Sequence, residues 1–545
     1  MTIGIASPPS PVNEPVRAYA PGSPERASLR RELDRQADMQ VEVPLRIGGR
    51  SVTTGRLGTM RMPHDHRHAL GTFHKAGPEE VAAAIEAAEA ARPAWAALSW
   101  EDRAAVFLRA AELLAGRFRD RLNAATMLVQ SKTAHQAEID AACELVDFFR
   151  FNVHYYRSIL EQQPACAPGM WNRLEYRPLD GFVFAVSPFN FTSIAGNLPT
   201  APALCGNTVV WKPASTAVLS AHYIMDLLDE AGLPPGVINF VPGSGAEVGD
   251  PVLADPRLGG VHFTGSTEVF QGIWRTVGVN IGAYRQYPRL VGETGGKDFV
   301  FAHPSADPVA VGVALVRGAF EYQGQKCSAA SRAYLPESLF PAVREYLADT
   351  IPQLGIGDVR DFKNFLGAVI DDRSYAKHTA AIAEAHEKVG GDVVEILGGE
   401  ASDEVGYFVG PTVIVTKNPS YRTMCEELFG PILTVYVYPD DAFDQTLALC
   451  DRTSPYGLTG AIFARDRGAV AKATRALRHA AGNFYINDKP TGAVVGQQPF
   501  GGSRASGTND KAGSALNLLR WLSPRTIKET FDPPRNFRYP YMEEV

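Results

Sequence analysis

The stretch Gly181–Pro188, "GFVFAVSP", is an apolar run of strand length that ends at a turn. Four further runs of this kind follow: "NTVVWKP" from residue 207, "VINFVPG" from 237, "GGVHFTGS" from 259 and "YPRLVGETGG" from 287. Segments with helical periodicity separate them. Short strands that are apolar on both sides and alternate with helices predict a parallel sheet that helices cover on both faces.

A second block of the same kind begins at Asp298. Its strands are predicted at "DFVFA", "SRAYLP", "TVIVT", "ILTVYVY", "TGAIFA" and "GNFYIND". Ahead of both blocks, residues 79–159 are rich in alanine and predict three or more amphipathic helices. The predicted fold class is therefore α/β, with two open α/β domains, and such domains bind ligands at the carboxyl ends of their strands.

The composition excludes several classes of protein. With 545 residues, a formal net charge of -7 and no basic stripe, the chain is expected to have several domains and no nucleic-acid partner. No apolar run reaches the ~18–20 residues of a membrane span. The first residues lack the pattern of a secretory signal or a transit peptide. We therefore expect no membrane span and a cytoplasmic location. The cluster "PHDHRH", Pro63–His68, lacks a second ligand group and predicts a turn without a metal.

Polar side chains and glycines follow the strands of the first block. Asn190 follows the first strand and could donate to a developing oxyanion, although an Asx turn would also explain it. Lys212 ends the second strand, where a lysine could bind a phosphate or ribose oxygen or lie on the surface. The next two strands end in glycine turns, "VPGSGAEVG" and "FTGS". Backbone N–H groups at the start of a helix suit a pyrophosphate, so the second turn predicts a nucleotide site.

Two later turns carry groups that could do chemistry. Glu293 lies in "LVGETGGKD", where a carboxylate in a tight turn could act as a base or cap the turn. Cys327 lies in "GQKCSAASR", and the residues after it could begin a helix. A thiol at a helix start beside Lys326 loses its proton more easily than a free cysteine, which predicts a nucleophile. The segment "EELFGP" adds Glu427 and Phe429 near a turn.

In this order, "PFN", "WKPA", "FTGS", "GETGGK", "GQKCSA" and "EELFGP" resemble the aldehyde dehydrogenase superfamily, from about Val43 to near the C-terminus. The resemblance implies that Cys327 adds to an aldehyde carbonyl, with Asn190 and the Cys327 backbone N–H at the oxyanion. It implies that Glu293 activates water. It also implies NAD as cofactor and no metal. The residues implied for cofactor binding are Ser187, Pro188, Phe189, Lys212, Ala214, Gly243, Gly245, Gly265, Ser266, Gly295, Glu427 and Phe429.

The resemblance also implies a domain layout. The expected parts are an N-terminal arm over residues 1–42, a Rossmann-like NAD-binding domain over 43–165 and 187–298, a catalytic domain over 299–515, and a small oligomerisation flap and tail over 166–186 and 516–545. The arm is expected on the surface, where a partner could order it. The segment "WNRLEYRPLD" is predicted to be a hairpin. We expect a homo-oligomer: a dimer, a dimer of dimers or a trimer of dimers.

Longer runs narrow the resemblance to one family. "AEIDAACELVDFFRFN", "VSPFNFT", "YQGQKCSAASR" and "DKPTGAVVGQQPFGGSRASGTNDKAG" are similar to the 1-pyrroline-5-carboxylate dehydrogenases. The resemblance implies that Ser328 and the loop Thr491–Ala493 hold the amino-acid end of the substrate, and that two phenylalanines sandwich its chain. The residues implied for substrate binding are Glu144, Phe191, Lys326, Ser328, Gly492, Ala493 and Phe500.

The implied activity is NAD-dependent oxidation of L-glutamate-γ-semialdehyde to L-glutamate in proline degradation, through a cysteine thiohemiacetal and a thioester. The alternative is an aldehyde dehydrogenase for another short acid semialdehyde. A silent binding protein would not need Cys327, Glu293 and Asn190 together. A thiol hydrolase would need a histidine partner that the sequence does not indicate. Because no flavin module accompanies the chain, a separate proline dehydrogenase is expected as a transient partner.

Ser215 departs from the wider superfamily. Many NAD-selective members carry glutamate three residues after the ribose lysine, where it would repel a 2′-phosphate; this chain has serine there. We therefore expect NAD as the preferred cofactor and NADP as usable but less effective.

Overall fold

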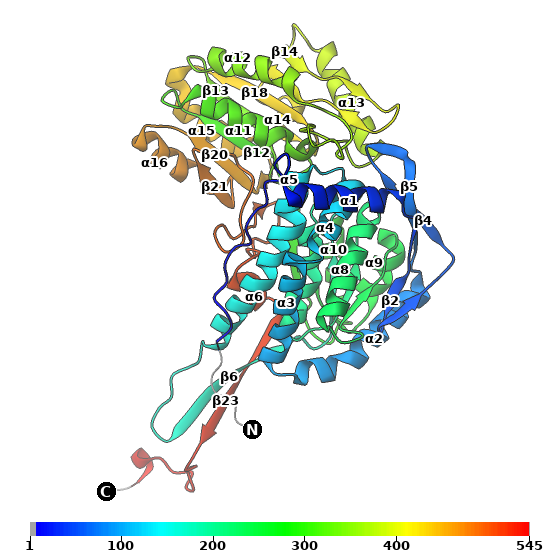
Figure 1. Cartoon of the computed structure of the whole chain (residues 1–545). Coiled ribbons are helices and arrows are strands. Elements are labelled where there is room, and N and C mark those ends of the chain that lie inside the picture. The colour runs from blue at the N-terminus through cyan, green and yellow to red at the C-terminus, as the bar shows by residue number, and fades with distance from the viewer. Residues whose placement is uncertain (1–6, 544–545) are drawn as a thin grey trace.

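The computed structural model describes residues 7–543; residues 1–6 of the expected arm and 544–545 of the expected tail lie outside them. Two α/β bodies lie against each other, and a long two-stranded ribbon projects from the body that contains the N-terminal half (Figure 1). Each body contains a seven-stranded sheet. The predicted α/β class with two open sheets is confirmed.

The first sheet contains all five strands predicted in the first block, and these five are parallel. Two short strands extend one edge, and the first of them is antiparallel to its neighbour. In spatial order the strands are β11 (Arg289–Glu293), β10 (Leu258–Thr264), β7 (Phe182–Val186), β8 (Val209–Lys212), β9 (Ile238–Phe240), β2 (Leu45–Ile47) and β3 (Arg50–Val52).

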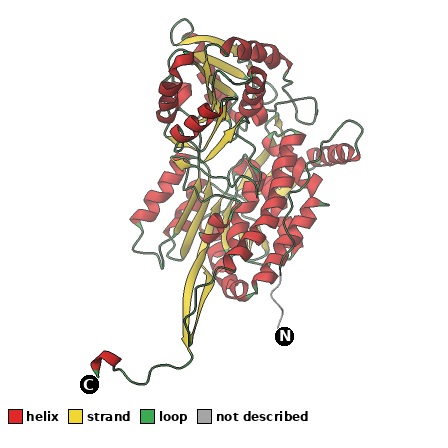
Figure 2. Ribbon diagram, turned by 90° about the vertical axis from the view of Figure 1, so that its left-hand side faces the viewer, coloured by secondary structure: helices red, strands yellow, loops and turns green. Residues whose placement is uncertain are grey.

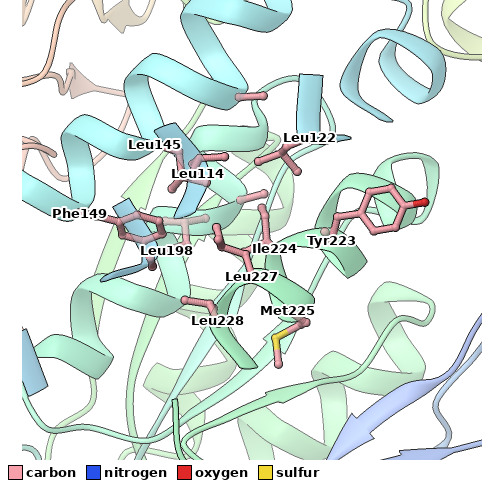
Figure 3. Close-up of a cluster of buried hydrophobic side chains, with 14 of the residues drawn as sticks. Leu114, Leu122, Leu145, Phe149, Leu198, Tyr223, Ile224, Met225, Leu227 and Leu228 are labelled. Atoms are coloured by element: carbon pink, nitrogen blue, oxygen red, sulfur yellow. The ribbon is translucent and has the colours of Figure 1, made fainter. Parts of the chain in front are cut away.

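Helices cover both faces of this sheet, as predicted. Successive side chains of β7 point to opposite faces: Val183 and Ala185 join one apolar cluster, and Phe182 and Phe184 join another. Figure 3 shows part of the first cluster, where leucines of several helices meet. The helices of this body are α2 (Pro78–Ala97), α3 (Trp100–Ala115), α4 (Arg119–Gln130), α5 (Ala134–Ala137), the π-helix η1 (Glu138–Glu144), α6 (Leu145–Leu160), α7 (Thr192–Leu204), α8 (Val218–Ala231), α9 (Gly245–Ala254) and α10 (Thr267–Val279).

The second sheet contains all six strands predicted in the second block, and one antiparallel strand is added at an edge. In spatial order the strands are β14 (Val393–Gly398), β17 (Thr412–Thr416), β18 (Ile432–Tyr438), β13 (Ala330–Pro336), β12 (Asp298–Ala302), β20 (Thr459–Phe463) and β21 (Asn483–Ile486). The accompanying helices are α11 (Pro308–Phe320), α12 (Phe340–Thr350), α13 (Asp372–Glu387), α14 (Arg422–Cys425), α15 (Phe443–Arg452) and α16 (Arg467–Ala476). The short helix α17 (Ala515–Leu519) returns the chain to the first body, where it contacts α6.

The ribbon corrects the predicted hairpin. Strand β6 (Met170–Pro178) does not fold back on its own neighbours but pairs antiparallel with β23 (Leu522–Thr530) near the other end of the chain. Figure 2 shows the two strands leaving the helical body together. The predicted flap over residues 166–186 was also too long, because β7 lies inside that range and forms the middle of the first sheet. A buried apolar strand cannot leave its sheet without exposing both of its faces to water.

The N-terminal arm packs on its own chain. Residues 24–38 form the helix α1 (Pro24–Asp38), and the sheet of β1 (Val41–Val43), β5 (Asp65–His74) and β4 (Leu57–Met62) follows it. Leu29 and Leu33 of α1 are fully buried in the same cluster as Tyr19. The expectation of a surface arm ordered by a partner was therefore wrong for these residues. In residues 7–543, no helix has both the length and the apolar character that crossing a membrane requires.

Candidate active site

Two cavities meet at Cys327. One, of about 470 Å³, is named here the aldehyde cavity, and it also contains Glu293 in its wall. The other, of about 820 Å³, is named the cofactor cavity, and Asn190 lies in its wall. The three predicted catalytic residues come from two different bodies of the molecule and lie around one point. The tertiary structure thus brings together side chains that are separated by up to 137 positions.

Cys327 lies in a turn between the short 3-10 helix Glu321–Gly324 and β13, and not at the start of a helix as predicted. Two residues ahead of the turn have left-handed backbone conformations, Tyr322 with φ 53° and Gln323 with φ 54°. Such conformations cost free energy and persist only where surrounding contacts enforce them. The Gln323 amide donates to the carbonyls of Ser131, at 3.0 Å, and Ala368, at 2.7 Å, which holds the turn in place.

The Cys327 thiol does not have the lowered pKa that its neighbour Lys326 suggested. Burial raises the pKa of Cys327 well above its usual value, and nearby carboxylates, Asp298 first among them, raise it further. The Lys326 ammonium pairs instead with Glu321 at 3.2 Å. The resting thiol is therefore protonated, and its proton must be removed when it reacts.

Asn190 is tied to the nucleophile turn. Its side-chain amide donates to the carbonyl oxygen of Gln325 at 3.1 Å, two residues before Cys327. Phe191 and helix α7 follow it directly, and the first residues of α7 have no capping side chain of their own. Asn190 and Cys327 both line the cofactor cavity, and a side-chain amide beside the thiol is the kind of donor that could stabilise an oxyanion.

Asp140 caps helix α7 from a distant segment. It lies in the π-helix η1, and its carboxylate accepts from the backbone N–H groups of Thr192, at 3.0 Å, and Ser193, at 2.8 Å. Lys132 donates to the same carboxylate at 2.6 Å and lies 4.3 Å from the centroid of the Phe191 ring. A carboxylate at a helix N-terminus stabilises that end of the helix. This pair therefore fixes the start of the helix beside Asn190.

Glu293 ends strand β11 and faces the aldehyde cavity. Its carboxylate accepts from the backbone N–H of Gly502 at 3.2 Å, and a Cβ at Gly501 would lie 3.0 Å from its other oxygen. Burial raises the pKa of Glu293 well above its usual value. A carboxylate with a raised pKa is a stronger base once it loses its proton.

The cofactor cavity collects eleven of the twelve residues predicted to bind the cofactor. The exception is Gly243, which does not line the cavity. A Cβ at that position would lie 2.7 Å from Val248 and 3.3 Å from the carbonyl of Ala76, so the glycine allows close packing. Gly245, two residues later, does face the cavity.

The donor set of the cofactor cavity fits a dinucleotide. Lys212 donates only to the neighbouring carbonyl of Pro213, at 3.3 Å, among the described residues, and burial lowers its pKa to about 8. Its remaining N–H groups suit ribose hydroxyls. Ser266 caps helix α10, whose N-terminus suits a pyrophosphate. At the other end, Phe429 contacts Phe189 edge to face at 5.8 Å between ring centroids.

The aldehyde cavity contains all seven residues predicted to bind the substrate: Glu144, Phe191, Lys326, Ser328, Gly492, Ala493 and Phe500. The Ser328 hydroxyl lies 2.8 Å from that of Thr491. Gly492 has φ 95°, a left-handed conformation that glycine adopts without strain. Glu144 accepts from the Ser193 hydroxyl at 2.6 Å, and burial raises its pKa to about 8. The cavity thus offers aromatic side chains, hydroxyls, lysines and acidic groups in its wall.

The profile of the aldehyde dehydrogenase family matches residues 55–527. The chain belongs to the aldehyde dehydrogenase family. It is 52% identical over 537 residues to the mitochondrial Delta-1-pyrroline-5-carboxylate dehydrogenase of Dictyostelium discoideum, covering 98% of this chain and 96% of that protein. It is 51% identical over 531 residues to the Delta-1-pyrroline-5-carboxylate dehydrogenase of Agaricus bisporus, covering 97% and 96%.

Among solved structures, this aldehyde dehydrogenase resembles the Delta-pyrroline-5-carboxylate dehydrogenase from Mycobacterium tuberculosis bound with NAD. The TM-score is 0.96, the sequence identity is 56%, and 100% of both chains is covered. The family resemblance predicted from the motifs is confirmed.

Several residues that line the aldehyde cavity were not predicted from the sequence. Lys489 and Asp147 line it, and so do Asn13 and Glu14 of the N-terminal arm. Asp147 could have been found, because it lies one helical turn after Glu144. The two arm residues carried no signal, since nothing in their local pattern places them beside a loop almost 500 positions later.

Proposed function

We propose that this aldehyde dehydrogenase oxidises L-glutamate-γ-semialdehyde to L-glutamate with NAD. The observation that carries the proposal is the position of Cys327, which lines both the cofactor cavity and the aldehyde cavity. A sulfur at this junction can bond to a carbonyl carbon in one cavity while the hydrogen on that carbon faces the other. The activity named for the relatives supports the substrate, and the NAD-bound relative supports the cofactor.

The chain's own residues account for the covalent steps. The Cys327 thiol loses its proton to solvent water, and the sulfur bonds to the carbonyl carbon, whose oxygen takes up the electron pair of the C=O π bond to form an ionised thiohemiacetal. The Asn190 amide and the Cys327 backbone N–H donate to the oxygen that gains negative charge. Bound NAD supplies the acceptor for the hydride that leaves this carbon. Glu293 then takes a proton from water, whose oxygen attacks the remaining thioester; the C–S bond breaks, the acid is released and the sulfur recovers a proton.

The wall of the aldehyde cavity matches the amino-acid end of the substrate. Lys326 and Lys489 supply cations, and the hydroxyls of Ser328 and Thr491 supply donors for an α-carboxylate. Acidic groups for an α-ammonium come from Glu144 and its neighbours on the helix. Phe191 and Phe500 flank the short aliphatic chain between the two ends.

The test is an NADH-production assay across short aldehydes, including 1-pyrroline-5-carboxylate, whose ring opens to the semialdehyde. We expect the highest kcat/KM with that compound. A higher value with another short acid semialdehyde would establish the alternative function. If the main activity is hydrolysis of a thioester in the absence of NAD, both the proposed function and the alternative are wrong.

Several further expectations remain proposals. The ribbon β6–β23 and the tail after it expose large side chains, with Phe537 79% and Tyr541 84% accessible, which favours a homo-oligomer formed through this region. NAD is expected to be preferred and NADP to be usable less well. A cytoplasmic location and transient contact with a separate proline dehydrogenase stay predictions, and one of the relatives carries the word mitochondrial in its name.

A further inference from the structure

The N-terminal arm forms part of the wall of the aldehyde cavity. Asn13, Glu14 and Val16 line it, although Val16 is 53% exposed to solvent. A lining residue that is half exposed lies at the outer edge of a cavity. In Figure 1 the dark-blue chain before α1 runs beside α6, and hydrogen bonds to Asp147 of that helix fix it there. The arm therefore lies at the outer edge of the aldehyde cavity, against α6.

The side chain of Asn13 connects two walls of this cavity. Its amide nitrogen donates to the carboxylate of Asp147 in α6 and to the carbonyl of Val495, both at 2.8 Å. Its amide oxygen accepts from the side chain of Gln497 at 2.9 Å. Both N–H groups and the oxygen are thus engaged. One residue spans from a helix to the loop that continues directly from Thr491–Ala493.

The conformation of the loop at residues 491–497 depends on contacts with other parts of the chain. Gly492 and Gly496 have φ angles of 95° and 84°, in the left-handed region, and the loop contains no regular helix or strand. Its short-range hydrogen bonds join Val494 to residues 497 and 498. The bonds from Asn13 attach this turn to α6.

We propose that Asn13 is a positioning residue, which sets the loop at residues 491–497 for the amino-acid end of the substrate. The inference rests on the proposed function, because it assumes that this loop binds an α-carboxylate. Asn13 acts through the loop and not on the reacting carbon. Its loss affects substrates that carry an amino-acid end and leaves simple aldehydes of similar length unaffected.

The backbone that presents Asn13 is anchored independently of its side chain. Glu14 pairs with Arg119 and Arg150, and the Tyr19 hydroxyl donates to the buried Glu138. Replacing the side chain at position 13 therefore removes the connection to the loop while the arm stays in place.

The experiment compares full-length wild type with Asn13→Ala, Asn13→Asp and the neighbouring control Val12→Ala. Asp keeps the shape of the side chain but removes both donors and adds a carboxylate beside Asp147. The KM for L-glutamate-γ-semialdehyde and the KM for butanal are measured with saturating NAD. For each Asn13 variant we expect the first to rise roughly threefold to tenfold, the effect of one or two lost hydrogen bonds, and the second to stay unchanged. Val12 is 70% exposed, and its variant should change neither.

Hydrogen–deuterium exchange gives a readout that does not depend on turnover. Amides at residues 494–498 should exchange faster in Asn13→Ala than in Val12→Ala, with the amides of α6 unchanged. Equal exchange in the two variants, or equal KM changes for both aldehydes, would overturn the proposal. If wild type does not oxidise the semialdehyde, the proposed function is wrong, and so is the inferred effect of Asn13 on substrate binding. The exchange data then decide whether the loop is tethered.

Discussion

The hydroxyl of Ser328, the residue after Cys327, lies 2.8 Å from the hydroxyl of Thr491, 163 positions later in the chain. This contact joins the turn that carries Cys327 to the loop at Thr491–Ala493, and both line the aldehyde cavity. The turn that carries the sulfur and the loop proposed to bind the substrate's amino-acid end are therefore in direct contact.

Ser328→Ala should weaken binding of substrates with an amino-acid end. A hydrogen bond to a charged group is worth about 1.5–3 kcal/mol, so KM for L-glutamate-γ-semialdehyde should rise roughly tenfold to 100-fold. KM for butanal should change little. Steady-state kinetics with both aldehydes measure this. If the semialdehyde KM is unaffected, another acid semialdehyde becomes the better candidate substrate.

Cys327→Ala should abolish aldehyde oxidation, because no other described thiol lines both cavities. We expect kcat to fall by on the order of 10⁴-fold or more. NAD binding, followed by isothermal titration calorimetry, should persist. Retained oxidation with a normal rate of NADH formation would remove the sulfur from the mechanism.

Glu293→Gln should separate the two halves of the reaction. The amide cannot take a proton from water, so thioester hydrolysis should slow by about 10²–10⁴-fold while the first turnover still produces a burst of NADH. Stopped-flow absorbance measures the burst and the steady state in one trace. Turnover at the wild-type rate without a burst would contradict the role of Glu293.

The raised pKa of Glu293 also predicts the direction of the pH dependence in wild type. The base form predominates above that pKa and becomes scarce below it, so hydrolysis should accelerate as the pH rises through the raised pKa. In Glu293→Gln this dependence of the steady-state rate should be lost. A hydrolysis rate that increases towards acid pH would show that another group is the base.

The buried pair Lys132–Asp140 should matter for stability. Asp140→Ala leaves a buried ammonium unpaired and removes the cap of α7, at a cost of about 3–5 kcal/mol in the free energy of unfolding. The double variant Lys132→Met with Asp140→Leu should lower the free energy of unfolding by less than the sum of the losses measured for Lys132→Met alone and for Asp140→Leu alone. Urea denaturation measures both, and strictly additive losses would show that the two groups are not coupled.

Ser215→Glu should sharpen the choice of cofactor. Ser215 is exposed, three residues after Lys212, and a glutamate there would repel the 2′-phosphate of NADP. We expect kcat/KM with NADP to fall roughly tenfold while the value with NAD is retained. Initial-rate assays with both cofactors test this. An equal or inverted preference in wild type would show that the interpretation of position 215 is wrong.

The local environment of Cys327 could not be predicted from its own segment. The motif "GQKCSAASR" predicted Cys327 as the nucleophile, but it also suggested a helix start and a lowered thiol pKa. The observed turn depends on Gln323 reaching Ser131 and Ala368, which lie in other parts of the chain. The raised pKa depends on burial by both bodies of the molecule. Neither the contacts of Gln323 nor the burial of Cys327 is encoded in a local sequence pattern.

Strand pairing also separates what the sequence predicts from what only the tertiary structure decides. Five strands of the first sheet and six of the second were predicted, because a run that is apolar on both faces has one favourable place, the interior of a covered sheet. Strand β6 is polar and half-exposed, and its segment was predicted to fold back on itself as a hairpin. It pairs with β23, about 350 positions away.

The sequence by itself determined the α/β class and the family, and it supplied the candidates for the catalytic side chains, because apolar periodicity and short motifs are encoded locally. The tertiary structure decided which groups meet: the thiol between two cavities, the carboxylate of Asp140 under α7, and the N-terminal arm beside the loop at 491–497. These contacts join segments far apart in the chain. Their geometry is fixed only when the whole core packs and each buried polar group must find a partner.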